Sequence, residues 1–194
     1  MPRQREFDNE KVLEKAMLLF WAQGYESTSV RDLNAAMGIS SSTMYEFFGD
    51  KRAIFLAALA RYCGIEQGRV AQIAAAAPSP QVFIENLFAS VNDVVLVEAG
   101  IQGSFAFNTM VEFGTRDPDV TAQLLDHFYK IGDIIAALIE AAQASGIVTS
   151  RAAPLDLAHT ILTTLQGVVT VVGVKADYPY RTPITRLLIE LLSR

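Results

Sequence analysis

The sequence predicts an all-α protein of about nine helices. Apolar residues recur at helical spacing through most of the 194 residues, and no segment shows the strict alternation of a half-buried strand. Serine, aspartate or proline stands at the start of several periodic segments, where a helix needs a cap or tolerates proline. We expect an N-terminal three-helix domain in residues 1–52 and a larger helical bundle in residues 53–194.

The first helix is expected from Asn9 to Gln23, and Gly24 ends it. Its apolar residues recur at positions i, i+3, i+4 and i+7, which places them on one face of an amphipathic helix. These residues are Leu13, Ala16, Met17 and Phe20. We expect this helix to support the two that follow.

Residues 29–51 contain two short helical patterns joined at a glycine. Ser29 and Asp32 have the spacing of a capping box, which predicts a helix over Val30–Met37. Gly38 is expected to adopt the left-handed conformation that a sharp turn between helices requires. The arrangement is a helix-turn-helix, a motif that also occurs in proteins that never bind DNA.

The second helix of this motif is expected over Ser41–Phe48, with Ser40 as its cap. Met44 and part of Tyr45 are expected to face inward together with Phe48. The side chains expected toward solvent are Ser41, Ser42, Thr43 and Phe47. Three consecutive small hydroxyl residues allow the start of a helix to lie close to a phosphate or a groove floor.

The stretch from Phe20 to Phe55 contains F-W-x-x-G-Y-E-S followed by T-S-V-R-D-L-x-x-x-M-G-I-S-x-S-T-x-Y-x-x-F-G-D-K. It resembles the DNA-binding domain of the TetR family of bacterial transcription regulators. The resemblance implies a homodimer whose partners are a double-stranded DNA operator and a small-molecule effector. A repressor that the effector releases from a pseudo-palindromic operator is the expected form.

By resemblance to the contact positions of that family, seven residues are candidates for DNA binding. Those expected at base edges are Arg31, Ser41, Ser42 and Thr43. Those expected at the DNA backbone are Tyr45, Phe47 and Lys51. Arginine binds guanine through two hydrogen bonds, whereas serine and threonine read bases permissively. Phe47 stands where relatives often carry histidine, so it offers only apolar contact.

The charge of the chain is unusual for a protein that binds nucleic acid. The net charge is −5, and residues 1–52 contain seven Lys or Arg and eight Asp or Glu. Sequence-independent coating of DNA is not expected, because it requires many cations that face phosphates. A specific dimer with a few well-placed cations is compatible with this charge, and its affinity should depend only modestly on salt.

Six further helices are expected after the helix-turn-helix. Asp50 caps a long helix from Lys51, which ends in the Ala-Pro-Ser segment at residues 74–80. The other five are expected over Gln81–Glu98, Phe105–Phe113, Pro118–Ser145 and Pro154–Lys175, and from Pro183 onward.

The stretch from Ala158 to Val174 is apolar almost all round, so two of its faces must be buried. One face is expected to pack in the core of its own chain. The other is expected to form a two-fold homodimer interface through the last two helices, as the TetR resemblance also implies. The alternative is a core helix that a single chain buries completely.

A small-molecule pocket is predicted between the bundle helices. Residues 103–120 resemble a stretch of one TetR subgroup in which several relatives carry cysteine where this chain has Ser104, so a thiol sensor is not expected there. The clustered aromatic and polar residues are typical of both a ligand pocket and a bundle core, and the resemblance favours the pocket. The candidate pocket residues are Phe105, Asn108, Met110, Glu112, Phe128 and Gln166.

The sequence shows no pattern typical of a catalytic, cofactor or metal site. It lacks a nucleophile elbow and a glycine-rich phosphate loop, and neither His127 nor His159 has a ligand partner at helical spacing. We therefore expect no catalytic residues, no cofactor and no metal. A single cysteine, Cys63, and the lack of a signal peptide or an 18-residue apolar run favour a cytoplasmic protein without a membrane partner.

Two alternatives to the ligand-responsive regulator belong to other functional classes. One is a non-inducible DNA-binding or helical protein-interaction regulator with the same fold. The other is an enzyme, which no acid, base or nucleophile arrangement in the sequence supports.

Overall fold

The computed structural model describes residues 9–91, 103–174 and 177–193. Over these ranges the chain forms helices and no strand, which confirms the predicted all-α class. The helices are α1 (Asn9–Gln23), α2 (Val30–Met37), α3 (Ser41–Phe48), α4 (Lys51–Ala76), α5 (Pro80–Ala89), α7 (Phe105–Phe113), α8 (Pro118–Ala144), α9 (Pro154–Val174) and α10 (Arg181–Leu191).

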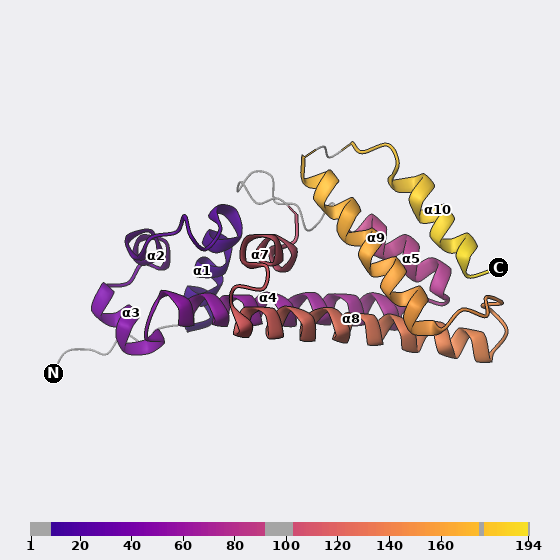
Figure 1. Cartoon of the computed structure of the whole chain (residues 1–194), viewed down its shortest axis with the longest axis horizontal. Helices are drawn as coiled ribbons and strands as arrows, with labels where there is room; N and C mark the ends of the chain where they lie inside the picture. The colour runs from indigo at the N-terminus through magenta and orange to yellow at the C-terminus, as the bar shows by residue number, and fades with distance from the viewer. Residues whose placement is uncertain (1–8, 92–102, 175–176, 194) are drawn as a thin grey trace.

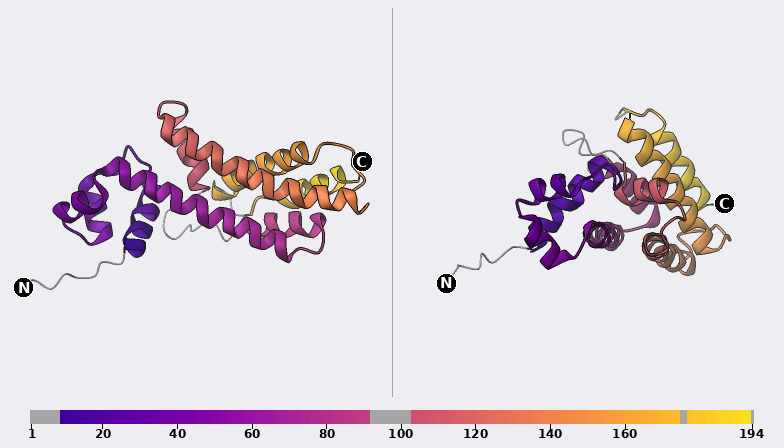
Figure 2. Two further views of the ribbon diagram at one scale, coloured as in Figure 1. Left: turned by 90° about the horizontal axis from the view of Figure 1, so that it is seen from below. Right: turned by 60° about the vertical axis from the view of Figure 1, so that its left-hand side comes forward.

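The molecule is elongated, with the helix-turn-helix at one end and a helical bundle at the other (Figure 1). Helices α1, α2 and α3 form the end domain, and α4 leaves it as a long helix with α8 packed alongside. Helices α5, α9 and α10 gather at the far end, and α7 lies beside the end domain. The views in Figure 2 show the same neighbours, so α4 connects the two ends of the molecule.

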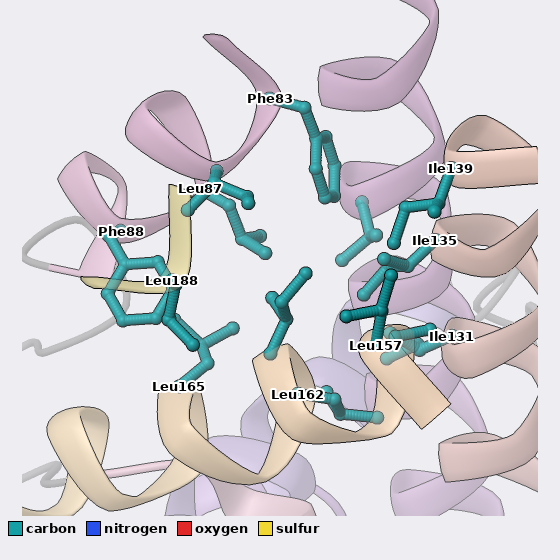
Figure 3. Packing of buried hydrophobic residues seen from close by; sticks show 14 of the residues in the cluster. Phe83, Leu87, Phe88, Ile131, Ile135, Ile139, Leu157, Leu162, Leu165 and Leu188 are labelled. Carbon is teal, nitrogen blue, oxygen red and sulfur yellow. The ribbon is translucent and has the colours of Figure 1, made fainter. Parts of the chain in front are cut away.

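Two hydrophobic cores lie along α4. The first surrounds Phe20, Met44 and Phe55 in the helix-turn-helix end, all fully buried. The second lies in the bundle, where apolar side chains of α5, α8 and α9 converge (Figure 3). Helix α4 contributes Phe55 to the first core and Val70 to the second, so a movement of this helix disturbs both.

The predicted caps of the helix-turn-helix are confirmed. The Ser29 hydroxyl accepts from the N–H of Asp32 at 3.1 Å, and the Asp32 carboxylate accepts from the N–H of Ser29 at 3.0 Å, which completes a capping box. Gly38 ends α2 in the left-handed conformation, with φ of 73°. Ser40 and Asp50 cap α3 and α4 as expected.

Helix α5 differs from the expected Gln81–Glu98 segment. It begins at Pro80, because the Ser79 side chain accepts from the N–H of Val82 and proline is tolerated at the first helical position. The Ser-Pro pair is expected from the sequence only to end the preceding helix, so this start corrects the prediction. Helix α5 ends at Ala89, and residues 92–98 of the expected segment lie outside the described residues.

The last helix begins at Arg181 and not at Pro183, the expected first residue. Proline is tolerated at the third position as well, because the N–H groups of the first turn have no partner within the helix. The start of α9 at Pro154 is as predicted, and it is described to Val174, since Lys175 lies outside the described residues.

Two glycine-to-alanine substitutions should have opposite effects on stability. A Cβ at Gly38 meets no atom within 4 Å, so the left-handed backbone alone should make Gly38→Ala destabilising by about 1 kcal/mol. Gly64 lies exposed inside α4 with equally open space, so Gly64→Ala should stabilise by about 0.5–1 kcal/mol. Urea unfolding of both variants measures the two changes, and an equal sign for both would contradict this account.

Candidate nucleic-acid interface and effector pocket

A network of short polar side chains fixes the start of α3. The Ser40 hydroxyl accepts from the N–H of Thr43 at 3.1 Å and lies 2.8 Å from the Ser42 hydroxyl. The Asn34 side chain of α2 donates to the Ser41 hydroxyl at 2.7 Å, across the turn. The three predicted base-reading hydroxyls are therefore held in one orientation before any DNA arrives, which lowers the entropic cost of binding.

Asn34 is a positioning residue that the sequence alone does not predict. Its amide bridges α2 and α3 over seven residues of the chain, a separation that no local spacing rule connects. The available signal was a polar residue three positions before the buried Met37, and it did not specify a partner.

The outer face of α3 carries large side chains that are unusually exposed. Tyr45 is 53% exposed and Phe47 is 52% exposed, whereas Met44 is fully buried beneath them. Met44 fixes the rotation of α3 on the core, so the hydroxyl residues and the two rings share the surface away from it. Tyr45 is therefore exposed and not partly inward, the orientation expected from the sequence. This face suits insertion into a DNA groove.

Three cations lie near this face, and they differ in how strongly the protein itself binds them. Arg31 is exposed at the first turn of α2. Lys51 lies with its Nζ 4.2 Å from the centre of the Tyr25 ring, a cation–π contact that holds it at the start of α4. Arg52 is bound instead by Asp117 and Asp119, at 2.9 and 2.6 Å. Hydrogen bonds to these carboxylates raise the pKa of Arg52, so this cation is committed to α8.

Glu112 connects α7 to the helix-turn-helix. Its two carboxylate oxygens accept from the backbone N–H groups of Tyr25 and Glu26, at 3.0 and 2.8 Å. Gly24 allows this approach, because a Cβ there would lie 3.0 Å from the carboxylate. Glu112 was predicted to line the pocket, and the structure places it at the junction between α7 and the loop after α1.

An aromatic cluster reinforces the same junction. The Phe55 ring lies 5.1 Å from Phe20, 4.9 Å from Tyr25, 5.9 Å from Phe105 and 5.1 Å from Phe113, measured between ring centres. The pair with Phe113 is stacked and the pairs with Phe20 and Phe105 are edge-to-face, both favourable geometries. The candidate pocket residue Phe105 therefore belongs to the core that joins α7 to the helix-turn-helix.

The six candidate pocket residues do not surround a single cavity. Asn108 is exposed, and Met110 and Phe128 are partly buried against the core of the helix-turn-helix end. Glu112 borders a surface hollow beside Tyr25, whereas Gln166 lines a separate, partly enclosed cavity between α4, α7 and α9. Among the six candidate pocket residues, Gln166 alone is a buried polar residue that lines a cavity within the bundle; its polar group is the side-chain amide.

His127 and Cys63 are both buried among other side chains. His127 is buried, its Nδ1 lies 3.3 Å from the Gln67 amide nitrogen, and burial lowers the pKa of its ring. Among the described residues no group of three or more potential ligands surrounds a metal position. Burial raises the pKa of the Cys63 thiol to about 12, so it carries almost no thiolate at neutral pH.

One described helix, α9, is long and apolar enough to span a membrane by length and composition, so the expectation that the chain lacks an 18-residue apolar run is wrong. Half of its most apolar window is already buried in the protein. A core helix of a globular bundle has the same composition, and the packing of α9 against α8 accounts for it here.

The helix-turn-helix and the exposed hydroxyl residues at the start of α3 place this protein in the class of DNA-binding transcription regulators. The chain belongs to the tetR family of bacterial regulatory proteins: the family model matches residues 12–58, and the model of tetracyclin repressor-like C-terminal domains matches residues 83–185. The predicted resemblance is thus confirmed, and the family consists of transcription regulators that are not enzymes.

Particular relatives support this placement. The chain is 29% identical over 136 residues to YezE, an HTH-type transcriptional regulator of Bacillus subtilis (strain 168), covering 66% of this chain and 70% of the relative. It is 31% identical over 123 residues to the HTH-type transcriptional repressor ComR of Escherichia coli (strain K12), covering 63% of this chain and 59% of that repressor.

Solved structures of similar proteins extend over the whole fold. A cysteine mutant of the TetR family regulator CifR, bound to 26-bp operator DNA, is 26% identical with a TM-score of 0.79 and covers 98% of this chain and 97% of that chain. The reduced form of E. coli NemR is 13% identical with a TM-score of 0.84, covering 95% and 96%. The likeness to NemR supports the fold alone.

Proposed function

We propose that the protein is a homodimeric repressor that a small-molecule effector releases from a pseudo-palindromic operator. The observation that carries this proposal is the preorganised start of α3, where Asn34 and Ser40 hold the hydroxyls of Ser41, Ser42 and Thr43 at an exposed helix end. A helix start with exposed hydroxyls and little charge fits the floor of the major groove. CifR, a similar regulator, is known in complex with its operator, and ComR is described as a repressor.

The proposed DNA contacts are those expected from the sequence. Arg31 and the three hydroxyl residues face base edges, and the DNA backbone is contacted by Tyr45, Phe47 and Lys51. Few cations take part, because Arg52 is bound to α8, so the affinity should depend only weakly on salt. The operator-binding unit is proposed to comprise residues 1–52, and the effector-binding and dimerisation unit residues 53–194. The protein is proposed to act in the cytoplasm.

The last two helices are the proposed dimer interface. Val171 and Val174 of α9 and Leu187 of α10 are exposed in the single chain, although α9 is apolar almost all round. A groove between these helices is lined by Thr164, Ile184, Leu187, Leu188 and Leu191. A second copy of the chain would bury this surface around a two-fold axis and place two α3 helices on one face of the DNA.

The effector is proposed to act by moving α4. This helix is packed into both cores, through Phe55 at one end and Val70 at the other. A ligand opposes operator binding only through its different affinities for the two states, and a typical coupling of ~1–3 kcal/mol changes operator affinity roughly 5–150-fold.

Selection of genomic DNA fragments by the purified protein tests this function. The proposal expects recovery of an inverted repeat that lies upstream of a small number of genes. Sedimentation of the free protein should give the mass of two chains. Recovery of unrelated fragments without a shared repeat, or a monomer that binds a single half-site as tightly, would contradict the proposal.

A further inference from the structure

A small, partly enclosed cavity of about 10 Å³ lies between α4, α9 and the start of α7. This volume is close to the space that one water molecule needs. Its wall combines apolar and polar side chains: Tyr62, Glu66, Arg69, Val91, Ser104, Leu165, Gln166 and Val169. A polar wall of this kind in a helical core is costly unless each polar group has a partner.

Gln166 leaves one polar atom of this wall without a partner. The residue is 9% exposed, and its Oε1 is buried without a hydrogen-bond partner among the described residues. An unpaired buried carbonyl destabilises the free protein, and a ligand that donates a hydrogen bond to it removes that penalty. The site therefore favours a ligand that carries a hydrogen-bond donor.

The charges in the wall already balance each other. The Arg69 guanidinium donates through two nitrogens to the Glu66 carboxylate, at 3.2 and 2.6 Å. Burial, with a further contribution from Glu66, raises the pKa of the Tyr62 hydroxyl, so this group stays neutral. A ligand with a net charge would lose its hydration without gaining a free counter-ion here. A neutral ligand is favoured.

We propose that this cavity is the effector site, and that it takes a compact neutral molecule with an apolar body and a hydroxyl or N–H group that donates to Gln166 Oε1. The apolar body packs on Leu165 and Val169. Because the cavity has room for only about one water molecule, binding of a larger ligand must separate α4 or α7 from α9. The inference rests on the proposed function and specifies the chemistry of its effector.

A direct path leads from this cavity to the helix-turn-helix. The Tyr62 hydroxyl donates to the Ser104 hydroxyl at 3.1 Å, and Ser104 also caps α7. The Trp21 ring of α1 lies 5.0 Å from the Tyr62 ring, and its Nε1 donates to the carbonyl of Gly103 at 3.2 Å. Widening the cavity therefore displaces contacts of α1 itself. Trp21 is the one tryptophan of the chain, so its fluorescence reports on the site.

The test uses cyclohexanol as the probe and methylcyclohexane, of similar shape but without a donor, as its control. We expect saturable binding of cyclohexanol that changes Trp21 fluorescence and weakens operator binding. Gln166→Leu removes the acceptor and keeps the size of the side chain, so it should weaken cyclohexanol binding by at least about tenfold. The matched variant Gln72→Leu, at an exposed position of α4, should bind like the wild type.

Circular dichroism verifies that Gln166→Leu is folded, and Gln166→Met replaces it in the test if it is not. The inference is overturned if cyclohexanol does not saturate, if methylcyclohexane binds equally well, or if the folded Gln166 variant binds cyclohexanol like the wild type. Operator binding of the probe-free wild type is measured in parallel. Operator binding with no probe effect refutes only this inference, whereas absence of operator binding refutes the proposed function itself.

Discussion

Replacement of Phe55 by alanine is expected to lower the free energy of unfolding by about 3–5 kcal/mol, the usual cost of deleting a buried aromatic ring. Phe55 is fully buried, and its ring contacts Phe20, Tyr25, Phe105 and Phe113. Deletion of the ring removes contacts to α1, α7 and the loop after α1 at once. Because proteins of this kind are stable by only about 5–15 kcal/mol, the loss would be a large part of the total.

Phe47→Ala is the matched control for this substitution. The ring of Phe47 is 52% exposed on α3, so its removal should change stability by no more than about 0.5 kcal/mol. Urea unfolding followed by circular dichroism measures both variants under one set of conditions. Similar losses for Phe55→Ala and Phe47→Ala would show that the aromatic cluster does not hold the two units together.

Arg31→Ala is expected to weaken operator binding by about 1–3 kcal/mol and to relax the preference at one base pair of each half-site. Arg31 is exposed at the first turn of α2, whereas its neighbour Asp32 is engaged in the capping box. Arg31→Lys keeps the charge and loses the planar two-donor geometry. This variant should therefore show the same relaxed preference with nearly the wild-type salt dependence.

Lys51→Ala provides the contrast for these variants. A phosphate contact carries no base information, so its loss should weaken binding to all sequences alike and reduce the salt slope by about one unit. Titrations of the operator and of its single-base variants at several salt concentrations separate the two behaviours. Equal losses and an unchanged base preference for Arg31→Ala and Lys51→Ala would refute the assignment of Arg31 to a base edge.

Local rules predicted the helix-turn-helix well. Its capping box at Ser29, its left-handed Gly38 and its caps at Ser40 and Asp50 all depend on residues within four positions of each other. The start of α5 was missed by the same rules, because a Ser-Pro pair both ends one helix and begins the next. With more residues between α4 and α5, the signal that ends α4 and the signal that begins α5 would have been separate in the sequence.

The contacts between distant segments were beyond such rules. Glu112 lies among aromatic residues in the sequence, as a polar pocket residue would. Its carboxylate instead accepts hydrogen bonds from the backbone N–H groups of Tyr25 and Glu26, more than eighty residues away. The pairing of Arg52 with Asp117 depends in the same way on how α4 and α8 meet. Helical periodicity specifies which face is buried, and it does not specify which element covers that face.

The central claim is that two copies of α3 read two half-sites of one operator. Hydroxyl-radical footprinting on the selected DNA, with the number of bound chains measured on the same complex, tests it most directly. The account predicts two protected patches related by a two-fold axis, with centres about 10–10.5 bp or a multiple of that spacing apart, and an even number of chains per operator. A single continuous footprint, or one chain per site, would contradict it.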